Sequence, residues 1–160
     1  MKYHRLTHKQ FEELHEEFSV FLSTHGIDHS KWNAIKIKNS DQVDALLDLF
    51  SDLVWDKISS ECKFLEYFTK DHLFLFKTAD YKTSAFVIKV SDKKIDLTSL
   101  EAFEWVLNNF NSDNVTLFQG SKAYDKSKND FVYSYLKKGA IRTDGNRFKA
   151  LETYFSNSAK

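Results

Sequence analysis

The chain has 160 residues, of which 42% are apolar and 29% charged, a composition typical of a globular domain large enough to bury a core. No apolar run approaches the roughly 18 residues that cross a bilayer, and the first residues lack the apolar run of a signal peptide. We therefore expect a cytoplasmic protein that is not inserted into membranes. The lone cysteine, Cys62, excludes an internal disulfide.

The net charge is zero, but it is distributed unevenly along the chain. Residues 1–60 carry a net charge of −3 and residues 120–149 a net charge of +5. Such asymmetry indicates either a polyanion partner for the basic segment or a fit between the two segments, within one chain or between subunits. The neutral total favours the second interpretation.

Helices are predicted for the first 60 residues. Thr7 and Gln10 have the spacing of a capping box, which predicts a helix from Thr7 to Gly26. Asp28 is the expected cap of a short second helix. Ser40 is the expected cap of a third helix over residues 41–59, because apolar residues recur there at the helical period.

The third helix carries an aspartate at every fourth position. On a helical wheel its core face lies opposite these carboxylates and consists of Val43, Leu46, Leu47, Phe50, Leu53, Val54 and Ile58. We call the opposite set the aspartate stripe: Asp44, Asp48, Asp52 and Asp56. A solvated face is its simplest interpretation. However, Trp55 falls among the aspartates with Leu49 beside them, which predicts that this face contacts something.

The remainder of the chain begins with three successive short strands, and single helices and strands follow. Strands are predicted at 63–68, 72–77 and 84–90, and a hairpin joins the last two. A Thr98–Glu101 capping box predicts a helix to Asn109, followed by a strand at 114–118 and a helix at 129–138 that ends at Gly139. A short strand and turn at 140–146 precede a last amphipathic stretch of one or two helical turns. The order predicts a single α+β domain, residues 1–160, with a mostly antiparallel sheet, because βαβ alternation is absent.

Candidate chemical sites are few. His8, Glu12 and His15 have spacings of four and three, which would place them on one helix face as metal ligands, but a second ligand motif is missing. Glu13, Glu16 and Glu17 could form a magnesium site with the aspartate stripe. Gly120, Ser121 and Lys122 could bind an anion in the loop expected after residue 118, although the loop lacks the other features of a phosphate-binding motif. We assign no catalytic residue, no metal site and no cofactor.

The basic segment 120–149 is the only candidate nucleic-acid surface. Tyr124, Tyr133 and Tyr135 could stack on bases, but Tyr135 also belongs to the predicted core stripe of its helix. We therefore expect no nucleic-acid partner.

Four stretches carry a resemblance to a known family: LTHKQFEELHEEF, LLDLFSDLVWDKI, FLEYFTKDHLFLF and GSKAY. With them the chain resembles an uncharacterised family of small proteins from bacteroidete-type bacteria, over most of its length. The resemblance implies a bacterial cytoplasmic protein of unknown function and carries over no catalytic residue.

The leading functional hypothesis is a noncatalytic binding or scaffolding protein that self-associates, with a homodimer as the expected state. Its predicted interaction surface joins Trp55, Leu49 and the aspartate stripe to basic residues of the segment 120–149, namely Lys122, Lys126, Arg142 and Arg147. The alternatives are a metal-dependent hydrolase that uses the carboxylate-rich helices and a weak nucleic-acid binder that uses residues 120–149.

Overall fold

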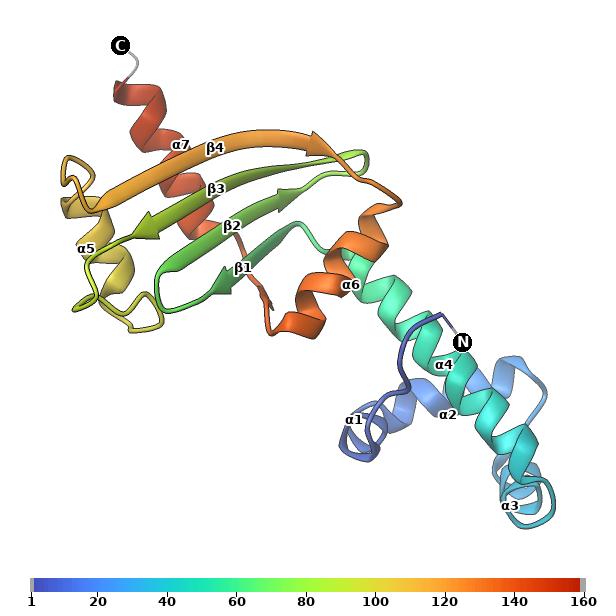
Figure 1. Ribbon diagram of the computed structural model, residues 1–160. Coiled ribbons are helices and arrows are strands. Elements are labelled where there is room, and N and C mark those ends of the chain that lie inside the picture. Colours follow the sequence, from blue (N-terminus) through green and yellow to red (C-terminus); the bar gives the residue numbers. More distant parts are fainter. Residues whose placement is uncertain (1, 159–160) are drawn as a thin grey trace. The chain divides into compact units, whose positions relative to one another are not determined.

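A computed structural model describes residues 2–158, and of Ser158 only the backbone. The chain divides into two compact units, Met1–Ile58 (unit 1) and Ser59–Lys160 (unit 2), and the helix α4 continues across the boundary. Unit 1 is helical, and unit 2 combines an antiparallel sheet with helices (Figure 1). The predicted α+β class is confirmed. Within the described range, no helix has the length and apolar character needed to cross a bilayer.

Unit 1 contains α1 (His8–Glu13), α2 (His15–Thr24), α3 (His29–Lys38) and most of α4 (Ser40–Glu61). The capping box at Thr7 and the cap at Asp28 are confirmed. The single helix expected from Thr7 to Gly26 is wrong, because the backbone of Leu14 (φ −105°, ψ 22°) interrupts it. The cap expected at Ser40 is also wrong, since the Asn39 Oδ1 accepts the hydrogen bond from the Gln42 N–H at 3.0 Å.

The core of unit 1 joins α4 to the preceding helices. Its buried members are Leu6, Phe21, Leu22, Ile27, Leu46 and Phe50. The Phe50 ring lies 5.0 Å from Phe18 and 5.3 Å from Phe21, as expected for the core face of α4. Leu53 departs from the helical wheel, because half of its surface is exposed. It lies at the edge of the predicted core arc, beside Leu49, which is 43% exposed.

Unit 2 is built on a five-stranded antiparallel sheet in the order β4-β3-β2-β1-β5. Its strands are β1 (Phe64–Phe68), β2 (His72–Thr78), β3 (Lys82–Val90), β4 (Val115–Ala123) and β5 (Ile141–Arg142). All predicted strands are present. The β2–β3 hairpin is also confirmed, and the Ala79 N–H donates to the Lys82 carbonyl across it.

Two elements of unit 2 have different bounds from those expected. The strand predicted to end at residue 118 continues to Ala123, so Gly120, Ser121 and Lys122 belong to β4 and not to an anion-binding loop. The helix expected from Thr98 begins only at Ala102, as α5 (Ala102–Asn108). The reason is local: the Thr98 N–H donates to the Asp96 carboxylate at 2.9 Å, so residues 96–98 form a turn.

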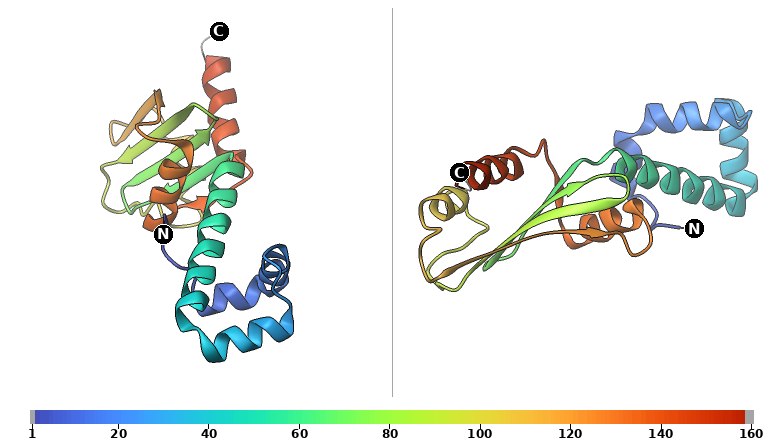
Figure 2. Two further views of the ribbon diagram at one scale, coloured as in Figure 1. Left: turned by 90° about the vertical axis from the view of Figure 1, so that its right-hand side faces the viewer. Right: turned by 90° about the horizontal axis from the view of Figure 1, so that it is seen from above.

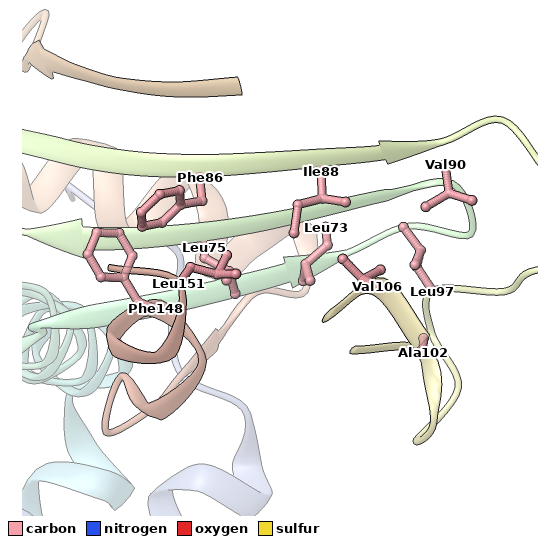
Figure 3. Close-up of a cluster of buried hydrophobic side chains, with 10 residues drawn as sticks. All are labelled: Leu73, Leu75, Phe86, Ile88, Val90, Leu97, Ala102, Val106, Phe148 and Leu151. Atoms are coloured by element: carbon pink, nitrogen blue, oxygen red, sulfur yellow. The ribbon is translucent and has the colours of Figure 1, made fainter. Parts of the chain in front are cut away.

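Helices cover both faces of the sheet. α5 and α7 (Asn146–Ser158) lie on one face, and α6 (Lys128–Lys138) lies on the other, as the two views of Figure 2 show. The larger core lies under α5 and α7 (Figure 3) and consists of Leu73, Leu75, Phe86, Ile88, Val90, Leu97, Ala102, Val106, Phe148 and Leu151. The α6 side buries Cys62, Leu65, Phe76, Val132 and Ala140. The strand order makes β4 and β5 the two edges of the sheet.

Candidate functional site

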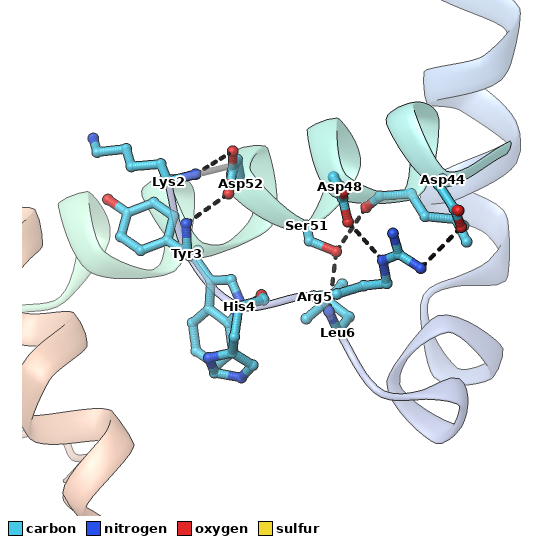
Figure 4. A network of polar contacts seen from close by, with 11 residues as sticks. Lys2, Tyr3, His4, Arg5, Leu6, Asp44, Asp48, Ser51 and Asp52 are labelled. Carbon is cyan, nitrogen blue, oxygen red and sulfur yellow. Dashed lines mark hydrogen bonds and ion pairs between the residues drawn. The ribbon is translucent and has the colours of Figure 1, made fainter. Parts of the chain in front are cut away.

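The aspartate stripe holds the N-terminal residues of its own chain against α4 (Figure 4). We call residues 2–6 the strap. Asp52 accepts hydrogen bonds from the backbone N–H groups of Lys2 and Tyr3, both at 2.8 Å. The Arg5 guanidinium donates to Asp48 at 2.6 Å and to Asp44 at 3.1 Å. The stripe therefore satisfies backbone donors and one guanidinium that would otherwise need water.

The last carboxylate of the stripe, Asp56, binds two side chains of the strap. The Lys2 ammonium lies 3.1 Å from Asp56, and the Tyr3 hydroxyl donates to the same oxygen. Burial and the neighbouring carboxylate raise the pKa of Tyr3, which keeps its hydroxyl protonated as a donor. The buried Ser51 completes the attachment by accepting from the Leu6 N–H at 3.0 Å.

Trp55 contacts the strap as well. Its indole Nε1–H donates to the His4 carbonyl at 3.1 Å, and the two rings lie 4.9 Å apart. Within unit 1, the contact expected for a tryptophan among aspartates is thus made with His4 of the strap. The pairing of this face with the basic segment 120–149 stays a prediction, but its electrostatic motive is weaker, since Lys2 and Arg5 already neutralise part of the stripe.

The candidate metal ligands of the N-terminal helices do not converge. His8 pairs with the Glu12 carboxylate at 2.9 Å, whereas the His15 Nδ1 lies 3.0 Å from the Glu12 backbone carbonyl. The interruption at Leu14 places His15 at the start of α2, whereas His8 and Glu12 belong to α1. Throughout the described residues, no three His, Cys, Asp or Glu side chains form a group that could hold a metal ion.

The four basic residues singled out from the sequence lie in unit 2, on β4, β5 and α7 and in the loop between β4 and α6. Lys122 projects from β4 and pairs with Asp125 at 3.5 Å. Lys126 and Arg142 are exposed. Arg147 has a structural role, because its guanidinium lies 2.7 Å from the buried Glu66 and within 6 Å of two phenylalanine ring centres. Lys122 and Arg147 thus each pair with a carboxylate of unit 2, and the four residues are spread over different parts of this unit.

The tyrosines considered for base stacking are mainly used in packing. The Tyr124 hydroxyl donates to the Ala79 carbonyl at 2.7 Å, and burial raises the pKa of Tyr124 to about 12. The Tyr135 ring lies 4.7 Å from Phe76, and its partial burial also raises its pKa. The Tyr133 ring has the Lys137 ammonium at 5.7 Å. This arrangement gives little support to nucleic-acid stacking.

A polar cavity of about 550 Å³ lies beside the Glu66–Arg147 pair, lined also by Thr143, Asp144 and Asn146. Its polar groups serve the turn that leads into α7. The Asp144 carboxylate accepts from the Asn146 side chain at 2.9 Å, and the Thr143 hydroxyl accepts from the Gly145 N–H at 3.1 Å. These bonds account for the polar lining without a ligand.

The surface with the strongest features for binding is the free edge of β4. This strand pairs with β3 over nine residues in constant register, from Lys82–Ala123 to Val90–Val115, so no bulge interrupts it. It has no proline, and Lys122 is its only charged residue. No strand of the described chain pairs with its other side, which is the outer edge of the sheet in Figure 1. Long edges of this kind usually carry proline, bulges or inward charges that prevent further pairing.

An apolar groove runs beside this edge on the α6 face of the sheet. We call it the β4 groove; its volume is about 470 Å³ and its lining includes Phe118, Gly120, Phe131, Tyr135 and Val87. Phe118 is 59% exposed, although its cross-strand partner Val87 is half-buried. The groove thus places an exposed aromatic ring directly beside an edge with unpaired backbone groups.

The sequence predicted neither the long edge of β4 nor the β4 groove. Gln119–Ala123 lack the aromatic and β-branched residues that mark strands, so the strand was expected to end at Phe118. The available signal was the absence of proline and of any further charge between residues 115 and 121. The contacts between the strap and the stripe were also missed, because five residues without periodicity carry no pairing signal.

Comparisons with known proteins assign a family but no activity. Residues 1–156 match the family of unknown function DUF6495. No curated protein and no solved structure matches the chain. The match covers nearly the whole chain, and the chain belongs to this family.

Proposed function

For this member of a family of unknown function, we propose a noncatalytic role: the protein binds other polypeptides by taking up an additional strand along β4. The observation that carries the proposal is the nine-residue edge, regular and almost uncharged, with the exposed Phe118 beside it. Strand addition supplies affinity through backbone hydrogen bonds and specificity through pockets for alternate side chains.

The β4 groove supplies such a pocket. Side chains of an added strand would alternate between the two faces of the sheet, so every second one would point to the α6 face. There Phe118, Phe131 and Tyr135 offer aromatic surface, and Lys122 lies at one end. A bound segment with an apolar residue opposite Phe118 fits this surface best.

The opposite edge of the sheet does not offer the same site. β5 consists only of Ile141 and Arg142, and short edge strands are one way in which proteins prevent further pairing. The contrast between two residues and nine favours β4 over β5 as the proposed binding edge.

Selection of peptides tests the proposed function. A displayed library of random peptides is panned against the purified protein, and amide hydrogen exchange maps where each selected peptide binds. We expect selected peptides to slow the exchange of β4 amides, because an added strand pairs with them. Titration with single-stranded RNA in parallel is expected to leave those amides unprotected.

Phe118→Lys is the test variant, since a charged side chain at an edge opposes pairing. Leu100→Lys is the matched control, because Leu100 is 92% exposed and lies outside the sheet. Phe118→Lys should weaken peptide binding at least tenfold, and Leu100→Lys should leave it unchanged. Peptides that protect other elements, or that bind both variants equally, would show that β4 is not the binding edge.

A further inference from the structure

We propose that the strand taken up by β4 is β4 of a second copy of this chain, paired antiparallel about a two-fold axis at Gln119. This inference rests on the proposed function, because it names the polypeptide that binds the same β4 edge. It also gives the expected self-association a defined surface and register.

The first argument is the length of the pairing. In a two-fold antiparallel pair, each residue faces the residue equally far from the axis on the partner strand. Gln119 is the middle residue of Val115–Ala123, so an axis there pairs all nine residues of both strands. Any other centre leaves residues of both edges unpaired.

The second argument is the fit of one aromatic ring over one glycine. This register places Phe118 opposite the partner subunit's Gly120, on the α6 face, and the symmetry repeats the contact. A Cβ built on Gly120 has no heavy atom within 4 Å, so the space above this glycine is open. Aromatic side chains opposite edge glycines stabilise strand pairs by covering their exposed backbone. Each dimer would therefore contain this contact between Phe118 and Gly120 twice.

The third argument is charge. In this register Lys122 faces the uncharged Thr116 of the partner subunit, and the two Lys122 side chains are six residues apart along the pair, about 20 Å. This separation exceeds the screening length of about 8 Å at physiological ionic strength. The register therefore brings no two charged residues of β4 close together.

Cysteine cross-linking tests the register. Directly opposed residues of an antiparallel pair have Cα atoms about 4.5 to 5.5 Å apart, which is within the range of a disulfide. Gln119→Cys should therefore form a covalent dimer on mild oxidation. Thr116→Cys is the matched control and should stay uncross-linked, because its two copies are about 20 Å apart. The native Cys62 is 3% exposed and supplies the background rate in the unmodified chain.

Sedimentation against concentration tests the contact itself. Gly120 has no left-handed backbone and open space at its Cβ, so Gly120→Val should keep the melting temperature of the monomer. It should nevertheless raise the dimer dissociation constant at least tenfold, because valine occupies the space needed by the partner's Phe118. An unmodified chain that stays monomeric at all concentrations would overturn the inference, as would a dimer unaffected by Gly120→Val. If peptides still protect β4 in such a monomer, the proposed function stands and only the choice of partner is wrong.

Discussion

Asp52 binds the backbone of the strap to α4. Its two carboxylate oxygens accept separate hydrogen bonds from the N–H groups of Lys2 and Tyr3. Backbone donors bound by an ionised side chain are worth more than neutral hydrogen bonds, and the Tyr3 side chain is 4% exposed. The sequence alone indicated an interchangeable carboxylate on a wet face. In the structure, Asp52 differs from the other aspartates of the stripe because it binds two backbone N–H groups.

Asp52→Asn should lower the free energy of unfolding by about 1 to 2 kcal/mol, because an amide has only one acceptor oxygen for the two N–H donors. Asp44→Asn is the matched control on the same helix face, and it should change stability by less than about 0.5 kcal/mol, as surface substitutions usually do. Urea unfolding followed by circular dichroism measures both values. Equal losses would mean that the strap is not held chiefly by Asp52.

The Arg5 guanidinium, which donates to Asp48, holds the pKa of that carboxyl below its ordinary value of 3.8. The folded state therefore favours the carboxylate. This contribution to stability is present above pH 3.8 and is lost as the pH falls through the lower pKa of the folded state. NMR titration of the Asp48 carboxyl carbon should show a midpoint below 3.8. Arg5→Gln should raise the midpoint, whereas Lys38→Gln should not move it.

At the scale of elements, the sequence predicted the existence of nearly every helix and strand but not all of their ends. Caps with local side-chain bonds, such as Thr7 and Asp28, were predictable because the bonding partners lie three residues away. The extension of β4 to Ala123 was not, because its cause is pairing with Lys82, 41 residues earlier. Non-local pairing of this kind overrides weak local propensity. For the same reason, the sequence did not predict the full length of the candidate binding edge.

The connection from β5 to α7 depends on a glycine. Gly145 has φ +83°, and a Cβ there would lie 2.5 Å from the Phe64 ring. Gly145→Ala should therefore destabilise unit 2 by about 2 to 5 kcal/mol, which combines left-handed strain of about 1 to 2 kcal/mol with overpacking of about 1 to 3 kcal/mol. Gly139→Ala is the control, because φ is +107° but the space is open, and it should show the strain alone. Similar losses in denaturant unfolding would contradict the predicted clash.

At the scale of the whole molecule, the chain contains separate apolar cores. One lies within residues 6–55, and two lie on the two faces of the sheet in unit 2. The sequence predicted one domain because no linker, repeat or change of composition marks a boundary. The structure explains this absence: the boundary at residue 58 falls inside the amphipathic helix α4, whose pattern continues across it. A boundary within a helix has no turn signal.

Separate cores predict that unit 1 can unfold locally. Phe50 is 4% exposed and lies within 6 Å of the rings of Phe11, Phe18 and Phe21, so Phe50→Ala should cost about 3 to 5 kcal/mol. If the units unfold separately, this loss accelerates amide hydrogen exchange in α2 and in α4 up to Ile58, while β2 and β3 keep their protection.

Leu75→Ala supplies the reciprocal measurement, because Leu75 is fully buried in the core of the sheet. It should accelerate exchange in β2 and β3 and leave α2 unchanged, since no side chain of α2 belongs to that core. Mass spectrometry of peptides from both variants measures the two patterns side by side. Faster exchange of all these elements in either variant would instead mean that α4 transmits the loss and that residues 1–160 unfold as one cooperative domain, because a continuous helix can couple the units without any shared core.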